Sequence, residues 1–302
     1  MNNSIVINQV IILFIMMGTG FYARKRTFIT DEGRKTMSDI LINITCPLII
    51  ISSFKFDFSM ELVNNILIVF IFSIVSHIFL ILLGKVLYNK YTGDKKAILR
   101  FITIFSNCAF MGYPLLQALY GKMGIFYGSI FQLAFNIFLW TYGVSLISGK
   151  TDRKALKKAL VNPGIIAVLI GFFIFLFSIK LPVPIYNAID MIGAMTVPLS
   201  MMIIGSNMAD MKLKDGFSKS EVYYISVVRL IFIPFITLII LKLIGLSDVV
   251  LGTCVIIQAM PAASMVAVIA ENHKGDRKFA SQCVFITTLL SLVTIPLILV
   301  FL

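Results

Sequence analysis

Charged residues are scarce in this chain of 302 residues: they make up 13% of it, against roughly 25% in a soluble domain. Hydrophobic residues make up 59%, and the mean hydropathy is +0.98. This shortage excludes an ordinary soluble domain and predicts that lipid surrounds most of the chain. The net charge of +12 does not indicate nucleic acid, because the basic residues form no patch with interleaved aromatics. They lie between apolar segments, as in membrane proteins.

Residues suited to covalent chemistry or metal binding are also few. The four cysteines, Cys46, Cys108, Cys254 and Cys283, lie singly within apolar runs, without metal-ligand spacing or a disulfide framework. We predict that they pack as small apolar side chains. No nucleophile–base pair or metal-ligand cluster is visible, so an enzyme is the least favoured class. Neither a metal nor a cofactor is expected.

Acidic residues are missing from the middle of the apolar segments. All fourteen fall in loops or near the ends of expected helices. Proton and cation antiporters usually depend on carboxylates within the membrane, so this absence argues against a cation substrate and fits an organic anion. Asp39 and Asp190 stand where two expected helices begin, and we predict that they are helix caps.

Ten apolar segments are each near the roughly 20 residues that a membrane-spanning helix needs. They are 5–22, 39–54, 63–88, 98–119, 124–147, 163–179, 188–208, 222–244, 249–271 and 280–301. No connection between them is long enough for a separate soluble domain. The sequence therefore predicts an all-α membrane protein with ten transmembrane helices.

The basic residues alternate from one connection to the next. Counted with the adjoining ends of the segments, the odd-numbered connections hold 21 Lys and Arg and the even-numbered ones hold 4. Because basic connections remain in the cytoplasm, we expect both termini outside the cell membrane. The first segment is followed, not preceded, by basic residues, which is the reverse of a cleavable signal peptide, so we expect it to be retained.

A basic linker at 150–162 separates two halves, 1–149 and 163–302, with five expected helices each. Five is odd, so the second half must enter the membrane in the opposite orientation. Thr45-Cys46-Pro47-Leu48 in the second segment matches Thr196-Val197-Pro198-Leu199 in the seventh. Topology and sequence thus both predict a 5+5 inverted repeat.

Prolines interrupt the fourth and ninth segments at corresponding places in the two halves. The fourth contains Gly112 and Pro114, and the ninth contains Pro261. Proline breaks a helix, and a pair of broken helices is typical of a transporter's binding site. The alternative is that both prolines only kink packed helices. If both helices open, two helix N-termini would meet near the middle of the membrane and attract an anion.

Five further residues are candidates for function. Asn107, Gln258 and Ser264 lie beside the prolines and could contact a substrate; a structural hydrogen bond is the alternative for the amides. Arg229 is the only full charge deep in a segment, and it could attract an anion, extend toward the membrane surface or bind backbone carbonyls. His77 could titrate in a coupling step, although a structural hydrogen bond is the more common role.

At these residues the chain resembles the auxin efflux carrier family, which includes bacterial malate and malonate permeases. The likeness spans nearly the whole chain. It rests on Asn107-x4-Gly112-x-Pro114-Leu115, Asn162-Pro163, Pro198-Leu199-Ser200 with Gly205, Val228-Arg229, Gln258-Ala259-x-Pro261 and Thr294-Ile295-Pro296-Leu297.

The resemblance implies that the fourth and ninth helices cross at their prolines, and that Asn107 contacts substrate. It also implies a scaffold of helices 1, 2, 6 and 7, transport helices 3–5 and 8–10, elevator-like alternating access and a homodimer formed through the scaffold. The long central loop of many plant members is absent here.

We therefore predict a permease for small organic anions, mono- or dicarboxylates, that works in the lipid bilayer without nucleic acid. The alternatives are a cation-coupled exchanger, such as a sodium–proton antiporter, and a membrane subunit or sensor without transport of its own.

Overall fold

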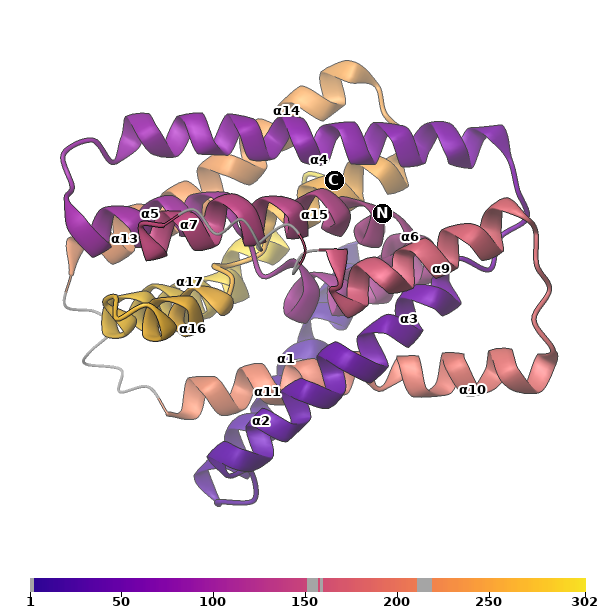
Figure 1. The fold of residues 1–302 in the computed structure, drawn as a ribbon, viewed down its shortest axis with the longest axis horizontal. Helices are drawn as coiled ribbons and strands as arrows, with labels where there is room; N and C mark the ends of the chain where they lie inside the picture. Colours follow the sequence, from indigo (N-terminus) through magenta and orange to yellow (C-terminus); the bar gives the residue numbers. More distant parts are fainter. Residues whose placement is uncertain (1–2, 151–156, 158–159, 211–218) are drawn as a thin grey trace. The chain divides into compact units, whose positions relative to one another are not determined.

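Helices account for every regular element in the described part of the computed structural model, which covers residues 3–150, 157, 160–210 and 219–302 (Figure 1). The expected linker at 150–162 lies mostly outside these residues. Six helical stretches are long and apolar enough to cross a membrane: Asp31–Ser53, Met60–Leu87, Cys108–Ser148, Val183–Ala209, Ser220–Ile244 and Arg277–Leu299. Each of the ten apolar segments expected from the sequence coincides with helical residues.

The chain divides into two compact units, and each draws segments from both halves of the sequence. The first unit is Met1–Val69, Ala109–Leu133 and Leu160–Asp210, and the second is Phe70–Cys108, Ala134–Ala159 and Met211–Leu302. Two helices contribute to both units: α4 (Met60–Leu87) and α6 (Tyr113–Phe138).

The other helical segments of the first unit are the long helix α1 and a set of shorter segments. They are α1 (Asn3–Lys25), α2 (Asp31–Ile40), η1 (Leu41–Thr45), α3 (Cys46–Ser53), η2 (Cys108–Gly112, whose first residue belongs to the second unit), α9 (Pro163–Leu176), α10 (Val183–Ala194) and α11 (Thr196–Ala209). Gly121 divides α6 with φ 59° and ψ −140°, a backbone conformation that only glycine adopts readily.

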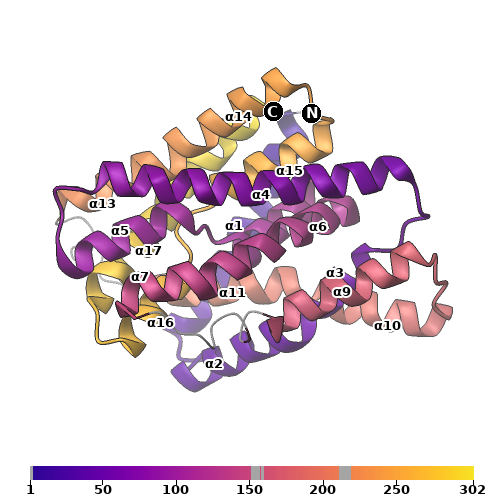
Figure 2. The same ribbon diagram turned by 45° about the horizontal axis from the view of Figure 1, so that its top comes forward.

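Glycines allow the helices of the first unit to approach closely. A Cβ atom at Gly20 of α1 would collide with the backbone of Met202 in α11, and one at Gly205 of α11 would collide with the backbone of Met17. Small residues that let two backbones meet are the usual means of packing helices within lipid. α3 packs in the same unit against both α9 and α10 (Figure 1, Figure 2).

Four charged side chains of the first unit form a cluster of ion pairs. Asp210 accepts hydrogen bonds from Arg24 Nε at 2.6 Å and from Arg34 Nη1 at 2.5 Å, and Asp31 accepts from Nη2 of both arginines. Partial burial acts to raise the pKa of Asp210, but the two arginines outweigh it and hold this pKa below its ordinary value.

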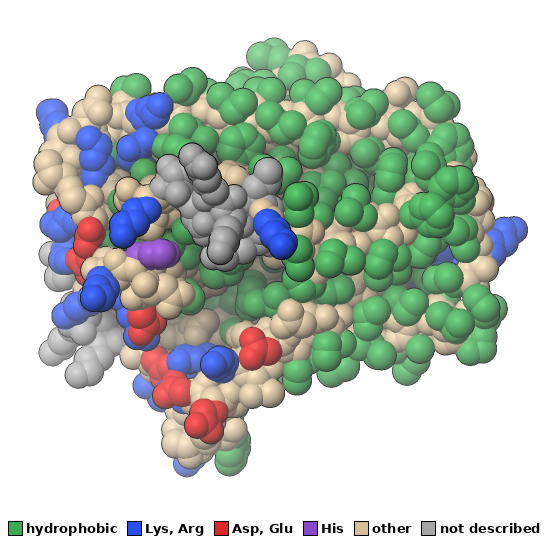
Figure 3. Space-filling view, in the orientation of Figure 1, with side chains coloured by type: hydrophobic (Ala, Val, Ile, Leu, Met, Phe, Trp, Pro, Cys, Tyr) green, Lys and Arg blue, Asp and Glu red, His purple; other side chains and the backbone are tan. Residues whose placement is uncertain are grey.

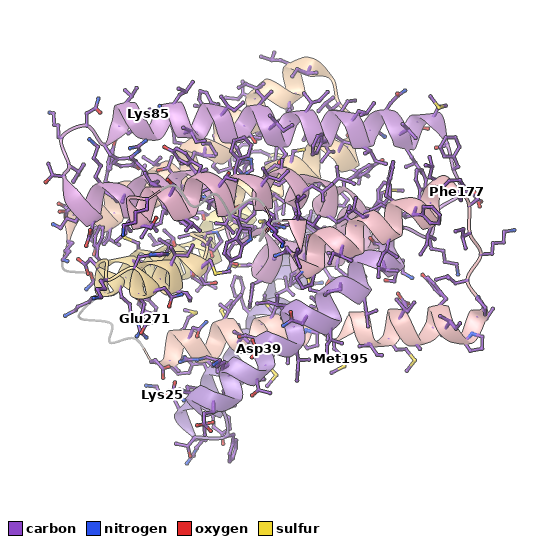
Figure 4. All side chains as sticks on the ribbon, in the orientation of Figure 1. Lys25, Asp39, Lys85, Phe177, Met195 and Glu271 are labelled. Atoms are coloured by element: carbon purple, nitrogen blue, oxygen red, sulfur yellow. The ribbon has the colours of Figure 1, made fainter. Side chains whose placement is uncertain are left out.

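The prediction that Asp39 and Asp190 are helix caps is wrong. Asp39 lies near the end of α2 (Figure 4), and the residue that caps this helix is Thr30, whose hydroxyl accepts from the Gly33 N–H at 3.0 Å. Asp190 lies inside α10 and forms an ion pair with Lys122 at 2.9 Å. Both helices begin before their apolar segments, because their first turns are polar or contain proline.

Among its described residues, the second unit adds nine helical segments to the parts of α4 and α6 that belong to it. They are α5 (Gly93–Ile104), η3 (Leu139–Gly143), α7 (Val144–Ser148), α13 (Ser220–Val227), η4 (Val228–Phe232), α14 (Ile233–Ile244), α15 (Asp248–Ala259), α16 (Met265–Asn272) and α17 (Arg277–Leu299). Lys95 of α5 pairs with Glu221 of α13 at 3.0 Å. Hydrophobic side chains cover most of the face seen in Figure 3, including that of α4, as lipid contact requires.

Candidate functional site

The sequence predicts a break at Gly112 and Pro114 in the fourth apolar segment, and the structure shows one a few residues before them. α5 ends at Ile104, and Phe105 has the extended backbone angles φ −108° and ψ 114°. Ser106 and Asn107 are also outside any helix, and the chain resumes as the π-helical turn η2 and then α6. Pro114 is the second residue of α6 and directly follows the π-helical turn η2, so it lies inside the helical stretch Cys108–Ser148 and cannot donate a backbone hydrogen bond to the preceding turn. The open residues therefore lie upstream of the proline.

The ninth segment is interrupted at its proline. α15 ends at Ala259, Met260 is extended with φ −67° and ψ 147°, and α16 begins at Met265. Pro261 lies within the gap, and Ser264 directly precedes α16. Both segments are thus interrupted, the ninth at Pro261 itself and the fourth upstream of Pro114, which lies within the helical stretch Cys108–Ser148.

The two breaks are hydrogen-bonded to each other within the second unit. The Asn107 N–H donates to the Pro261 carbonyl at 2.8 Å, and the Ala263 N–H donates to the Phe105 carbonyl at 3.1 Å. Ser106 and Ala262 form an antiparallel bridge between these bonds. Each break thus supplies backbone partners that the other lost on leaving the helix, as an apolar membrane interior requires.

A side chain from the last helix completes this pairing. The Thr287 hydroxyl of α17 accepts from the Ala262 N–H at 3.2 Å and donates to the Cys283 carbonyl at 2.7 Å. Thr287 is fully buried. Sequence reasoning missed this residue; the signal available was a pair of threonines, Thr287 and Thr288, near the middle of the tenth apolar segment.

Arg229 binds backbone carbonyls next to the breaks. Its Nε donates to the Met260 carbonyl at 3.0 Å, Nη1 to the Thr103 carbonyl at 3.1 Å and Nη2 to the Gln258 carbonyl at 3.0 Å. The side chain is 0% exposed, and no carboxylate among the described residues pairs with it. Of the roles that the sequence left open, the structure shows binding to backbone carbonyls.

The sequence around Arg229 explains how it reaches this position. Pro234 is the second residue of α14 and cannot donate a backbone hydrogen bond to the preceding turn. The helix widens there into the π-helical turn η4, Val228–Phe232. A π-helical turn redirects its side chains relative to a regular helix, and such turns are frequent at functional sites.

Asn107 and Gln258 differ in their surroundings. Both are nearly buried, at 6% and 2% exposed. The Gln258 side-chain oxygen lies 3.5 Å from Arg229 Nη2, which is a weak contact. The side-chain amide of Asn107, in contrast, forms no hydrogen bond with another described residue. Of the predicted site residues, the second unit brings together Asn107, Gln258, Pro261 and Arg229, and Ser264 follows them in the chain. Gly112 and Pro114 belong to the first unit.

His77 lies among aromatic rings. Its ring is stacked on Phe138 at 5.1 Å and meets Phe135 edge-on at 5.7 Å, and Phe105 of the first break lies 6.0 Å away. Nδ1 donates to the Ser73 carbonyl at 2.6 Å. A histidine that hydrogen-bonds its own helix and packs on three phenylalanines suits a neutral, structural role better than proton transfer.

Comparisons with known proteins identify the family of this chain. The sequence profile of a family described as membrane transport protein matches residues 5–299. The chain belongs to this family. The match confirms the resemblance to auxin efflux carriers, and it makes the chain a multi-pass membrane transport protein.

Relatives within the family span most of the chain. An uncharacterized transporter of Methanocaldococcus jannaschii is 25% identical over 97% of both chains, and one of Methanothermobacter thermautotrophicus is 24% identical over 95% of both. A proposed malonate transporter of Rhizobium meliloti is 27% identical over 140 residues, which cover 46% of this chain and 43% of the relative.

Proposed function

We propose that this transporter moves small organic anions, mono- or dicarboxylates, across the cell membrane by alternating access. The observation that carries the proposal is the hydrogen-bonded pair of breaks, because irregular backbone within a membrane is tolerated where it is buried or lines a substrate cavity. The substrate would bind beside Asn107, whose amide can donate to a carboxylate.

Charge supports an anion as substrate. No Asp or Glu among the described residues is buried, whereas Arg229 is a buried positive charge in the second unit. α16 begins directly after the second break, and a helix N-terminus carries about half a positive charge. The partial similarity to a proposed malonate transporter agrees with a dicarboxylate.

The proposed architecture has ten transmembrane helices in a 5+5 inverted repeat, with the fourth and ninth crossing and both termini outside. The segments expected to form the scaffold, 5–22, 39–54, 163–179 and 188–208, all belong to the first unit. The second unit contains most of the expected transport helices. Segments 63–88, 98–119 and 124–147 are each divided between the two units. In the proposed elevator mechanism the transport helices move against the scaffold, and a homodimer formed through the scaffold would hold the scaffold fixed in the bilayer.

Uptake of labelled malonate and malate into proteoliposomes that contain the purified chain alone tests the proposal. We expect Asn107→Ala to raise KM roughly 10- to 100-fold, because a hydrogen bond to a charged group contributes about 1.5–3 kcal/mol. Asn65→Ala is the matched control, since Asn65 is a half-buried asparagine that donates to Tyr127 in the first unit. Its KM should be unchanged.

The same vesicles distinguish the alternatives. Sodium flux without carboxylate flux would replace the proposal with a cation exchanger, and no flux at all would favour a subunit or sensor. Carboxylate uptake with the same KM in Asn107→Ala as in the parent chain would show that the substrate does not bind beside the breaks.

A further inference from the structure

Arg229 occupies an unusual position, between the carboxyl ends of two helices. Thr103 lies in the last turn of α5, Gln258 lies in the last turn of α15, and Met260 follows α15 directly. The carbonyls of all three residues accept from the guanidinium at 3.0–3.1 Å. One side chain therefore joins the first halves of both interrupted helices.

The charges at this junction balance without a carboxylate. The carboxyl end of a helix carries about half a negative charge, so the ends of α5 and α15 together contribute about one unit. The guanidinium contributes one positive unit at the same place. A buried charge needs such compensation, and here the backbone provides it.

Carbonyls of this kind have a known use in transporters with interrupted helices. Unwound backbone and the carboxyl ends of half-helices coordinate Na⁺ or other coupling cations there. In this chain the guanidinium holds three of these carbonyls. A diffusible cation cannot use them while Arg229 is in place.

We propose that Arg229 is a tethered cation, which takes the place of a coupling cation at the junction of α5 and α15. Anion transport then requires no sodium ion bound there. Arg229 is a positioning residue: it neutralises the negative helix ends, so that the positive end of α16 remains available to the substrate. The transport part rests on the proposed function, whereas the occupancy of the junction does not.

Thermal unfolding of the purified chain in detergent tests the occupancy without any substrate. Arg229→Ala should melt several degrees below the parent chain, and millimolar methylguanidinium should restore part of this loss by binding the vacated carbonyls. Arg100→Ala is the control, because Arg100 is a half-buried arginine of the second unit, which donates to Tyr142 instead of to helix ends. Methylguanidinium should not stabilise it.

Two results in this assay would overturn the proposal. One is that methylguanidinium fails to stabilise Arg229→Ala or stabilises Arg100→Ala equally. The other is that sodium stabilises the parent chain relative to choline, which would mean that a sodium site coexists with Arg229. The second measurement remains decisive if Arg229→Ala does not fold.

Conservative variants separate the effect of the positive charge of Arg229 from the effect of its hydrogen bonds to the two helix ends. Arg229→Lys keeps the positive charge, whereas Arg229→Gln keeps only a hydrogen-bond donor. We expect malonate affinity to stay within about threefold in the lysine variant and to fall about tenfold in the glutamine variant, at similar melting temperatures. Equal malonate affinities in the two variants would show that Arg229 acts only through its hydrogen bonds and not through its charge. Absence of malonate binding in the parent chain would count against the proposed function instead.

Discussion

Replacing Gly20 with alanine should separate two helices of the first unit. A Cβ atom at this position would lie 2.5 Å from Cα and 2.7 Å from the carbonyl carbon of Met202 in α11. Unstrained carbon–carbon contacts are about 3.5–4.0 Å, so α1 and α11 must move apart by roughly 1 Å. The obstacle is backbone, which cannot rotate aside as a side chain can.

The cost of this separation follows from packing. A gap of 0.5–1 Å forfeits about a quarter to a half of the dispersion attraction along the contact. Overpacking of a well-packed interface typically costs about 1–3 kcal/mol. We therefore expect the melting temperature of Gly20→Ala in detergent to fall by several degrees.

Gly18→Ala is the matched control, two residues earlier on the same helix. A Cβ atom there has nothing within 4 Å. Since alanine favours the helix over glycine, this variant should melt at the same temperature as the parent chain or slightly above it. Equal melting of the two alanine variants would refute the close approach of α1 and α11.

Two further predictions concern the breaks and the charged end of the first unit. Thr287→Val should leave the Ala262 N–H without its acceptor, lowering the melting temperature and malonate affinity, whereas Thr288→Val serves as a control that keeps this hydrogen bond. Unchanged affinity in Thr287→Val would show that the second break does not need this bond. In the folded protein the pKa of Asp210 is below its ordinary value of 3.8. The stability that the Asp210–Arg24 ion pair adds to the fold is therefore complete above pH 3.8 and is lost as the pH falls through the lower pKa of the folded state. Melting curves from pH 7 to about pH 3 should therefore show the deficit of Asp210→Asn shrinking toward acid, and a deficit independent of pH would contradict this.

The breaks illustrate how far local chemistry predicts structure. Proline weakens or breaks a helix, so interruptions near Pro114 and Pro261 can be expected from the sequence, although Pro296 lies inside the continuous helix α17. The exact positions of the interruptions do not follow from the sequence. Pro114 fits the first turn of α6, and the open residues are Phe105–Asn107, whereas Pro261 itself lies in the second gap. The difference depends on which backbone groups find partners.

Polar residues within the spans were recognisable, but their partners were not. The sequence left three roles open for Arg229, and for Gln258 it left substrate contact or a structural hydrogen bond. The structure places the Gln258 side-chain oxygen 3.5 Å from Arg229, and it shows His77 against three phenylalanines. Such assignments depend on residues far away in the chain.

The sequence alone determined that this is a helical membrane protein whose fourth and ninth apolar segments carry prolines and whose acidic residues avoid the middle of the apolar segments. Those properties follow from the length of apolar runs, the chemistry of proline and the cost of burying charge, all of which act locally. Only the tertiary structure decided that the breaks bond to each other and that Arg229 joins them. Thr103 is 126 residues from Arg229, and backbone groups freed in lipid must take whatever partner folding brings to them.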